Sequence, residues 1–133
     1  MVVRQTYKLT QVVATSTENK RFEQTLDVNV KTKKGSTYYL YTEALDEHKL
    51  KCVLKVEENR VKIRRRGVIN MNFTFVKDTL TDTFYESLAG RHHFFVHTND
   101  IQLNDNVIHI DYDLYEGDEK LGNYKYTLKK EEK

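Results

Sequence analysis

Several residue types are scarce or missing in this chain of 133 residues, and each absence narrows the fold. The sequence contains no proline, no tryptophan and a single cysteine, Cys52. A chain without proline or low-complexity runs is neither a proline-rich linker nor a polyproline ligand. One thiol cannot form an internal disulfide, and small secreted domains usually depend on several disulfides. We therefore expect a reducing, cytoplasmic location.

Long apolar runs are also lacking. No window approaches the roughly 18 apolar residues that a membrane-spanning helix needs, and the N-terminus MVVRQTYKLT has no signal-peptide core. The charges nearly balance, with 22 Lys and Arg against 20 Asp and Glu. Nine tyrosines and six phenylalanines argue against a disordered chain, which would be poor in aromatic residues. The composition predicts a globular domain without a membrane span.

Apolar and polar residues alternate with period two through most of the chain, which is typical of strands. Eleven runs of this kind, which we expect to make about ten strands, lie at residues 3–15, 22–30, 38–41, 50–56, 61–66, 71–75, 80–87, 92–97, 101–103, 108–114 and 124–128. Residues 43–47 are expected to form at most one helical turn, and residues 129–133 a charged tail. No composition shift divides the chain, so residues 1–133 are expected to form one domain.

This pattern favours a closed sheet. Parallel strands need crossover helices, and the chain has no room for them, so neighbouring runs should pair antiparallel. A sheet of about ten strands curls or closes, and closure removes its unpaired edges. We predict an all-β, closed, antiparallel up-and-down barrel of about 8–10 strands. A two-sheet sandwich is the alternative.

Five short motifs, in a fixed order, are similar to those of a known family. They are Tyr38-Tyr39-Leu40-Tyr41, Leu54-Lys55-Val56-Glu57, Ile63-Arg64-Arg65-Arg66-Gly67, Met71-Asn72-Phe73, and Tyr85 five residues before Gly90. Together they resemble the YwiB family of uncharacterised bacterial proteins. The resemblance implies a calycin-like (lipocalin-like) barrel with an interior cavity, and it implies no function. The chain departs from the family at residues 87–90, where the family tends to have a Thr-Pro-Tyr-Gly turn.

Polar residues on apolar strand faces are candidates for an interior binding site. Arg65 shares its face with Val61 and Ile63, and a buried guanidinium must be paired. Asp82 or Glu86 would pair with it in an empty barrel, whereas an anionic head group would do so in a filled one. Alternatively, Arg65 lies in a solvated ion pair at the barrel mouth. The candidate interior ligand-binding residues are Arg65, Phe73, Phe75, Asp82, Phe84, Glu86, His92, Phe94 and Tyr112.

Signals for catalysis or metal binding are weak. The sequence has no GxSxG, HExxH or glycine-rich phosphate loop. His93 and His97 share a strand face but lie roughly 13 Å apart along a strand, too far to bind one zinc ion. Cys52 shares its face with leucines and is expected to be inert. A dyad of Asp82 with His92 is the one conceivable acid–base pair, and we expect no enzyme, no metal and no cofactor.

A basic hairpin dominates the charge distribution. Residues 48–66 contain eight basic and two acidic residues, whereas residues 105–119 contain six acidic residues and no Lys or Arg. An outward-facing basic patch is predicted at Lys49, Lys51, Lys55, Lys62, Arg64 and Arg66. Such a patch would bind phosphates, for example of RNA, or an acidic protein. It would otherwise be a solvated face that keeps the sheet soluble.

Three functional hypotheses follow from these features. The first is a non-enzymatic binding protein that holds a small amphipathic or anionic ligand inside the barrel. The second is a module that binds a polyanion such as RNA, or an acidic protein, through the outer basic hairpin. The third is an interaction protein with a packed core and no ligand. The sequence carries no signal for the oligomeric state.

Overall fold

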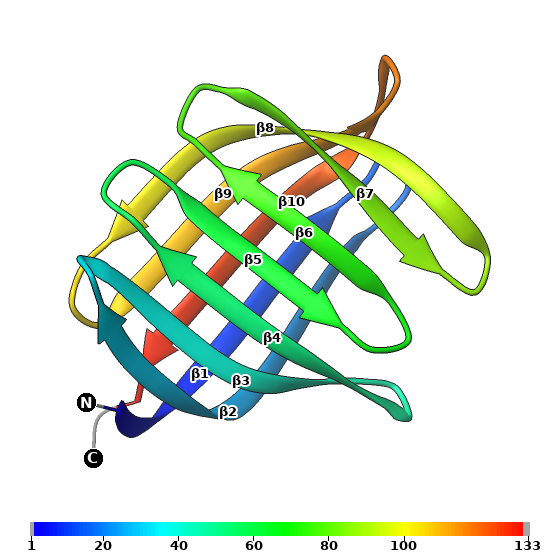
Figure 1. The fold of residues 1–133 in the computed structure, drawn as a ribbon. Coiled ribbons are helices and arrows are strands. Elements are labelled where there is room, and N and C mark those ends of the chain that lie inside the picture. Colours follow the sequence, from blue (N-terminus) through cyan, green and yellow to red (C-terminus); the bar gives the residue numbers. More distant parts are fainter. Residues whose placement is uncertain (1, 132–133) are drawn as a thin grey trace.

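Ten antiparallel strands close into a barrel in the computed structural model, which describes residues 2–131 (Figure 1). The strands are β1 (Val2–Ala14), β2 (Asn19–Lys33), β3 (Ser36–Leu45), β4 (His48–Val56), β5 (Val61–Arg66), β6 (Asn70–Phe75), β7 (Leu80–Ser87), β8 (Gly90–Leu103), β9 (Val107–Glu116) and β10 (Glu119–Lys130). Each strand pairs with its neighbours in sequence, and β1 pairs with β10 to close the barrel. The predicted closed up-and-down barrel is confirmed.

Several strand boundaries differ from the expectations, and three of these differences change the assignment of a segment. Residues 43–45 continue β3 instead of forming a helical turn, because their backbone groups pair with β4 up to Leu45 and His48. Residues 101–103 belong to β8, which is continuous through a bulge between Thr98 and Asp100. Residues 129–130 belong to β10 and pair with β1, while residues 132–133 of the expected tail lie outside the described part.

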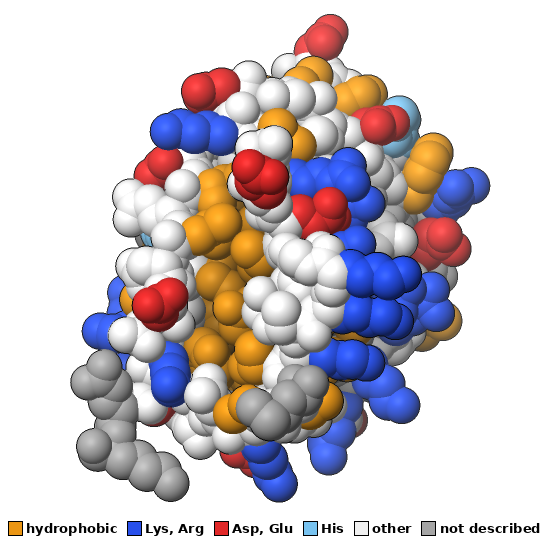
Figure 2. All heavy atoms as spheres, turned by 60° about the vertical axis from the view of Figure 1, so that its left-hand side comes forward, with side chains coloured by type: hydrophobic (Ala, Val, Ile, Leu, Met, Phe, Trp, Pro, Cys, Tyr) orange, Lys and Arg blue, Asp and Glu red, His pale blue; other side chains and the backbone are white. Residues whose placement is uncertain are grey.

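One half of the barrel is tightly packed. Its fully buried side chains include Leu9, Leu54, Phe75, Ile110 and Leu128. Cys52 is also buried, as its face predicts. Figure 2 shows the end of the barrel where the chain termini lie, with hydrophobic side chains visible between polar ones and Lys and Arg concentrated along one side. No helix within residues 2–131 is long and apolar enough to cross a membrane.

β7 presents the opposite face from the one predicted, so the inward placement of Asp82, Phe84 and Glu86 is wrong. Phe84 is 44% exposed on the outer surface. The exposed carboxylates of Asp82 and Glu86 pair with His93 and Arg91 of β8. The other face of the strand points inward.

The hairpin between β7 and β8 explains this orientation. A two-residue turn at residues 88–89 joins the strands, so Phe84 lies opposite His93 and Tyr85 lies opposite His92. Directly opposite residues of an antiparallel pair share one face of the sheet. Because His92 faces the interior, Tyr85 does so too, and Phe84 must follow His93 outward.

Two pairs of strands separate along part of their length. β2 pairs with β3 only between residues 29–33 and 36–40. Beyond that, the Gln24 side chain bridges the gap, because its Oε1 accepts a hydrogen bond from the Ala44 backbone N–H at 3.0 Å. Between β6 and β7 the backbone pairing is limited to two positions, and the Thr83 hydroxyl donates to the Asn72 carbonyl where the ladder stops. The β2–β3 gap adjoins the unpacked half of the barrel.

Candidate functional site

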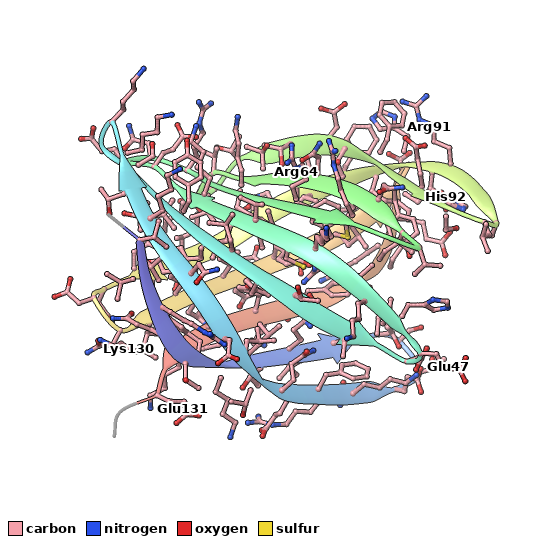
Figure 3. All side chains as sticks on the ribbon, turned by 60° about the horizontal axis from the view of Figure 1, so that its bottom comes forward. Glu47, Arg64, Arg91, His92, Lys130 and Glu131 are labelled. Atoms are coloured by element: carbon pink, nitrogen blue, oxygen red, sulfur yellow. The ribbon has the colours of Figure 1, made fainter. Side chains whose placement is uncertain are left out.

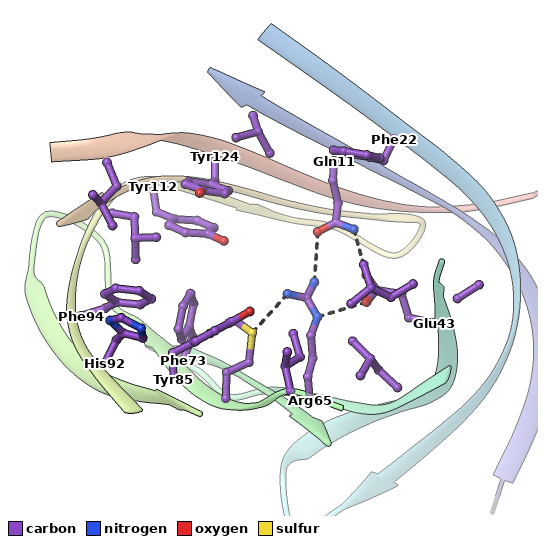
Figure 4. A pocket seen from close by; sticks show the side chains of 18 of the residues that line it. Gln11, Phe22, Glu43, Arg65, Phe73, Tyr85, His92, Phe94, Tyr112 and Tyr124 are labelled. Carbon is purple, nitrogen blue, oxygen red and sulfur yellow. Dashed lines mark hydrogen bonds and ion pairs between the residues drawn. The ribbon is translucent and has the colours of Figure 1, made fainter. Parts of the chain in front are cut away.

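A cavity of about 490 Å³ lies in the half of the barrel opposite the termini (Figure 4). Its lining reaches the rim at Phe22 of β2, Leu45 of β3 and Leu121 of β10, next to the turns at that end. Phe22 is 51% exposed and Leu45 is 36% exposed, so the rim itself is partly apolar. A volume of this size lies within the range of small-molecule binding sites.

A buried ionic network forms one wall of the cavity. The Arg65 Nε donates to the Glu43 Oε2 at 3.0 Å, and the Arg65 Nη2 donates to the Gln11 Oε1 at 3.1 Å. The Gln11 Nε2 in turn donates to the Glu43 Oε1 at 3.1 Å. Figure 4 shows this closed triangle of side chains from β1, β3 and β5. Arg65 is thus buried and paired, and the alternative of a solvated ion pair is wrong.

The partner of Arg65 differs from the predicted ones. Glu43, only 5% exposed, takes the place expected for Asp82 or Glu86, because those two side chains point outward. Burial alone would lower the pKa of Arg65, but the Glu43 carboxylate and nearby tyrosine hydroxyls more than offset it and hold that pKa above its usual value. Arg65 therefore stays protonated, and Glu43 neutralises its charge.

Hydrogen-bond donors without a strong acceptor remain on the cavity side of this network. Within residues 2–131 the one hydrogen-bond acceptor of the Arg65 Nη1 is the Met71 sulfur, at 3.7 Å, and thioether sulfur is a weak acceptor. The Tyr112 hydroxyl makes no hydrogen bond within residues 2–131, and it points into the cavity on the Arg65 side in Figure 4. Burial raises the pKa of Tyr112, so its hydroxyl remains a donor. Two hydrogen-bond donors thus face the open volume.

Aromatic rings form much of the rest of the wall. Tyr112 stacks on Tyr124 with their ring centroids 5.3 Å apart, and Tyr85 packs against Phe94 at 5.6 Å. Phe73 lies edge-on to Tyr112 at 6.0 Å. The cavity is therefore an aromatic pocket with a small polar region, the composition typical of sites for small organic molecules.

His92 closes the cavity near its mouth. Its ring is parallel to that of Phe94, with the centroids 5.7 Å apart, and its Nδ1 lies 2.9 Å from a carboxylate oxygen of Glu116. The conceivable dyad of Asp82 with His92 does not form, because Asp82 instead lies 2.9 Å from His93 on the outer surface. No cluster of three or more potential metal ligands occurs within residues 2–131.

Of the nine predicted interior residues, five line the cavity: Arg65, Phe73, His92, Phe94 and Tyr112. Phe75 is fully buried but belongs to the packed half, outside the cavity lining. The lining residues outside the predicted set include Gln11, Glu43 and Tyr85. Gln11 and Glu43 each carry a detectable signal, because both are polar residues in register with apolar residues of their strands.

The basic hairpin faces outward as predicted. Lys51 lies opposite Arg66, and Lys55 opposite Lys62, on the outer face of β4 and β5. Lys55 contacts Glu57 at 3.6 Å. The other five members of the predicted patch, namely Lys49, Lys51, Lys62, Arg64 and Arg66, form no ion pair within residues 2–131. None of these five cations therefore has a carboxylate at ion-pair distance in the described part of the chain.

Comparison with known proteins identifies the family. Residues 8–128 match the model of a domain of unknown function, DUF1934. This chain belongs to the DUF1934 family. A curated relative, the uncharacterized β-barrel protein YwiB of Bacillus subtilis (strain 168), is 33% identical over 92 residues. That match covers 66% of this chain and 65% of the relative, slightly less than two thirds of its length.

The fold of this DUF1934 chain is also that of a solved relative. The crystal structure of the YwiB protein from Bacillus subtilis matches it with a TM-score of 0.82 and 26% sequence identity. The match covers 98% of this chain and 94% of that one. The resemblance to the YwiB family is thus confirmed, together with the β-barrel fold. The family has no assigned function, so a function must be argued from the site.

Proposed function

We propose that this DUF1934 protein is a non-enzymatic binding protein that holds a small, largely apolar ligand in the barrel cavity. The supporting observation is the aromatic cavity of about 490 Å³ with the Arg65 Nη1 and the Tyr112 hydroxyl facing its open volume. Aromatic walls remove apolar ligand surface from water, and a few placed donors orient one end of the ligand. The ligand would carry a hydrogen-bond acceptor at that end.

The charge balance of the wall favours an uncharged acceptor. Glu43 already neutralises Arg65 through a 3.0 Å ion pair. A ligand carboxylate would therefore add an unpaired negative charge in a poorly solvated site, where charge is costly. A carbonyl or hydroxyl oxygen accepts the same two hydrogen bonds without that cost. The proposed ligand is accordingly amphipathic and neutral, which narrows the sequence-based expectation of an amphipathic or anionic one.

Binding rather than catalysis fits the ionisable groups of the cavity. Arg65 and Glu43 each bond to the other and to Gln11, which fixes both side chains in the cavity wall. Burial keeps the pKa of Tyr112 above its ordinary value, which disfavours its use as a base near neutral pH. The wall is thus suited to hold a molecule without transforming it.

A pair of fluorescent probes tests this proposal. Nile red is neutral and carries a carbonyl, whereas anilinonaphthalene sulfonate is anionic. We expect the protein to bind Nile red more tightly, and Tyr112→Phe to weaken that binding about fivefold or more, the effect of one lost hydrogen bond. Tyr115→Phe is the matched control, because Tyr115 lies outside the cavity lining and helps line a separate groove. Equal affinities in wild type and Tyr112→Phe, or preference for the anionic probe, would contradict the proposal.

A second candidate function is polyanion binding by the outer basic hairpin. It is supported by the exposed side chains of Lys51, Arg64 and Arg66, which lack acidic partners within residues 2–131. Clustered, unpaired cations release counterions when phosphates bind, which gives salt-dependent affinity. These three side chains lie on the outer face of the barrel and do not line the cavity.

A further inference from the structure

A groove of about 580 Å³ runs over the outer surface of β5–β8. Arg65 and Met71 belong both to its lining and to that of the barrel cavity. Arg64 and Arg66 of β5 line one side, Asn70 and Asn72 of β6 line its floor, and Arg91 of β8 lines the other side. Figure 3 shows Arg64 and Arg91 on the same side of the barrel, away from Lys130 and Glu131. Three guanidinium groups thus converge on one outer groove.

The far side of this groove carries a stack of planar side chains. The Arg91 guanidinium lies over the Phe84 ring, 3.8 Å from its centroid. Phe84 in turn stacks on His93 with their centroids 4.7 Å apart, and His93 packs against Phe95 at the same distance. Arg91 and Phe84 line the groove, whereas His93 and Phe95 do not. The stack therefore ends at the groove in a guanidinium plane backed by aromatic rings.

We infer that this groove binds single-stranded nucleic acid. The inference rests on the second candidate function, polyanion binding by the basic hairpin, and names the polyanion. Arg64 and Arg66 hold backbone phosphates, since guanidinium groups match phosphate geometry. A base stacks on Arg91, whose plane Phe84 supports, because nucleic-acid bases stack on guanidinium planes as well as on aromatic rings.

The exposed amides of β6 suit the same ligand. Asn70 and Asn72 lie opposite Arg66 and Arg64, so each amide stands beside a guanidinium on the outer face. Amide side chains donate and accept hydrogen bonds, so they can contact either phosphates or base edges. An acidic protein segment would use the cations, but it would have no use for a planar stack. The combination therefore favours a nucleic acid over an acidic protein.

Two carboxylates also border the groove, and their partners limit their repulsion of phosphate. Glu86 lies 3.9 Å from Arg91, and Asp82 lies 2.9 Å from His93. Both are on β7, on the stacking side of the groove. Arg64 and Arg66 are separated from these carboxylates by β6. The phosphates of the bound strand would therefore lie along β5, and its bases along β7 and β8.

The test compares an oligonucleotide with a polyanion that has no bases. Binding of a short fluorescein-labelled oligouridylate is followed by anisotropy at several salt concentrations, with inorganic polyphosphate as an unlabelled competitor. Arg91→Lys keeps the charge but removes the stacking plane. We expect it to weaken oligouridylate binding about fivefold or more and to leave polyphosphate binding unchanged. Phe84→Leu, which removes the ring that supports Arg91, is expected to act in the same direction.

Charge reversal tests the proposed phosphate contacts of Arg64 and Arg66. Arg64→Glu with Arg66→Glu removes two phosphate contacts and should make the slope of log K against log salt shallower by about 1.4. Lys20→Glu with Lys129→Glu is the control, because it changes the net charge equally at exposed positions of β2 and β10. The control should bind nearly as well as wild type.

The outcomes distinguish the inference of nucleic-acid binding from the broader proposal of polyanion binding. If oligouridylate and polyphosphate bind equally and Arg91→Lys alters neither, the nucleic-acid inference is overturned while polyanion binding stands. If neither ligand binds at low salt, both are overturned. If the control pair weakens binding as much as the reversal at Arg64 and Arg66, the groove is not the site and the inference is again overturned.

Discussion

The Arg65 guanidinium of β5 reaches across β4 inside the barrel to the Glu43 carboxylate of β3, with its Nε 3.0 Å from the Glu43 Oε2. Both side chains are buried, with exposed fractions of 8% and 5%. Gln11 of β1 completes the network from another strand. The network therefore links three separate strands at the wall of the cavity, and its stability depends on both charges of the ion pair being present.

Removing one charge of this pair is expected to destabilise the fold strongly. Glu43→Gln leaves the buried Arg65 charge without a counter-charge and should lower the free energy of unfolding by about 3–5 kcal/mol. The double variant Glu43→Gln with Arg65→Met removes both charges and should recover most of the loss. Urea unfolding of the three proteins measures this coupling.

The matched control is Asp27→Asn. Asp27 forms an ion pair with Arg4 at the same 3.0 Å distance, but both side chains are more than 60% exposed. Exposed pairs contribute at most about 1 kcal/mol. If Glu43→Gln lowers the free energy of unfolding no more than Asp27→Asn does, the buried ion pair does not stabilise the fold as proposed.

Alkaline solution is expected to destabilise the protein. Burial, together with the nearby Glu43, raises the pKa of Cys52 from 9.0 to about 12, and burial also raises those of Tyr41 and Tyr126. Each of these groups is held neutral in the fold, so its contribution is fully present below its unfolded-state pKa. Above about pH 9 the unfolded state loses protons that the folded state keeps, and the free energy of unfolding falls as the pH rises towards 12.

Unfolding in urea at a series of pH values measures that decline. Alkylation of Cys52 by iodoacetamide gives a second readout, because the thiolate is the reactive form. At pH 8 the folded protein should react at least about a hundredfold more slowly than the urea-unfolded chain. Similar rates in the two states would show that the thiol is neither buried nor protonated as described.

The orientation of β7 gives a prediction that a single pair of variants decides. Phe84→Ala truncates a ring that is 44% exposed on the outer surface, and it should lower the free energy of unfolding by no more than about 1 kcal/mol. Phe75→Ala truncates a fully buried ring and should cost about 3–5 kcal/mol. Chemical unfolding measures both. A larger cost at Phe84 than at Phe75 would mean that β7 faces the other way.

The barrel was predictable because the chain offers few competing structures. Period-two alternation without helical stretches leaves antiparallel strands, and about ten of them close into a barrel. The inward faces of most strands follow from the same alternation, as at Leu54 and Ile110, because their partners on both neighbouring strands are apolar or aromatic too.

β7 was mispredicted because both of its faces carry apolar residues. Leu80 and Phe84 alternate with Tyr85, so the pattern alone does not choose between the faces. The register across the turn at residues 88–89 does choose, since it places Tyr85 opposite His92. An inward His92 and an inward Phe84 are incompatible with that two-residue turn, and this conflict is visible in the sequence.

Glu43 was missed for a related reason. The run Glu43-Ala44-Leu45-Asp46-Glu47 has the composition of a short helix, and helical propensity concealed the strand. The hairpin register places Glu43 opposite the buried Leu50. A strand reading would therefore have put its carboxylate inside, beside the inward Arg65. The cavity itself depends on how side chains pack, which alternation does not encode.

Backbone NMR during a titration with Nile red locates the bound molecule most directly. If the barrel cavity is the binding site, saturable shifts of amide resonances will centre on Phe73, Tyr85, Phe94 and Tyr112. The amide resonances of the turn at residues 57–60, at the opposite end of the barrel, will stay constant. Saturable shifts confined to the outer face, or none at concentrations where Nile red fluorescence rises, would contradict the claim that this barrel holds its ligand inside.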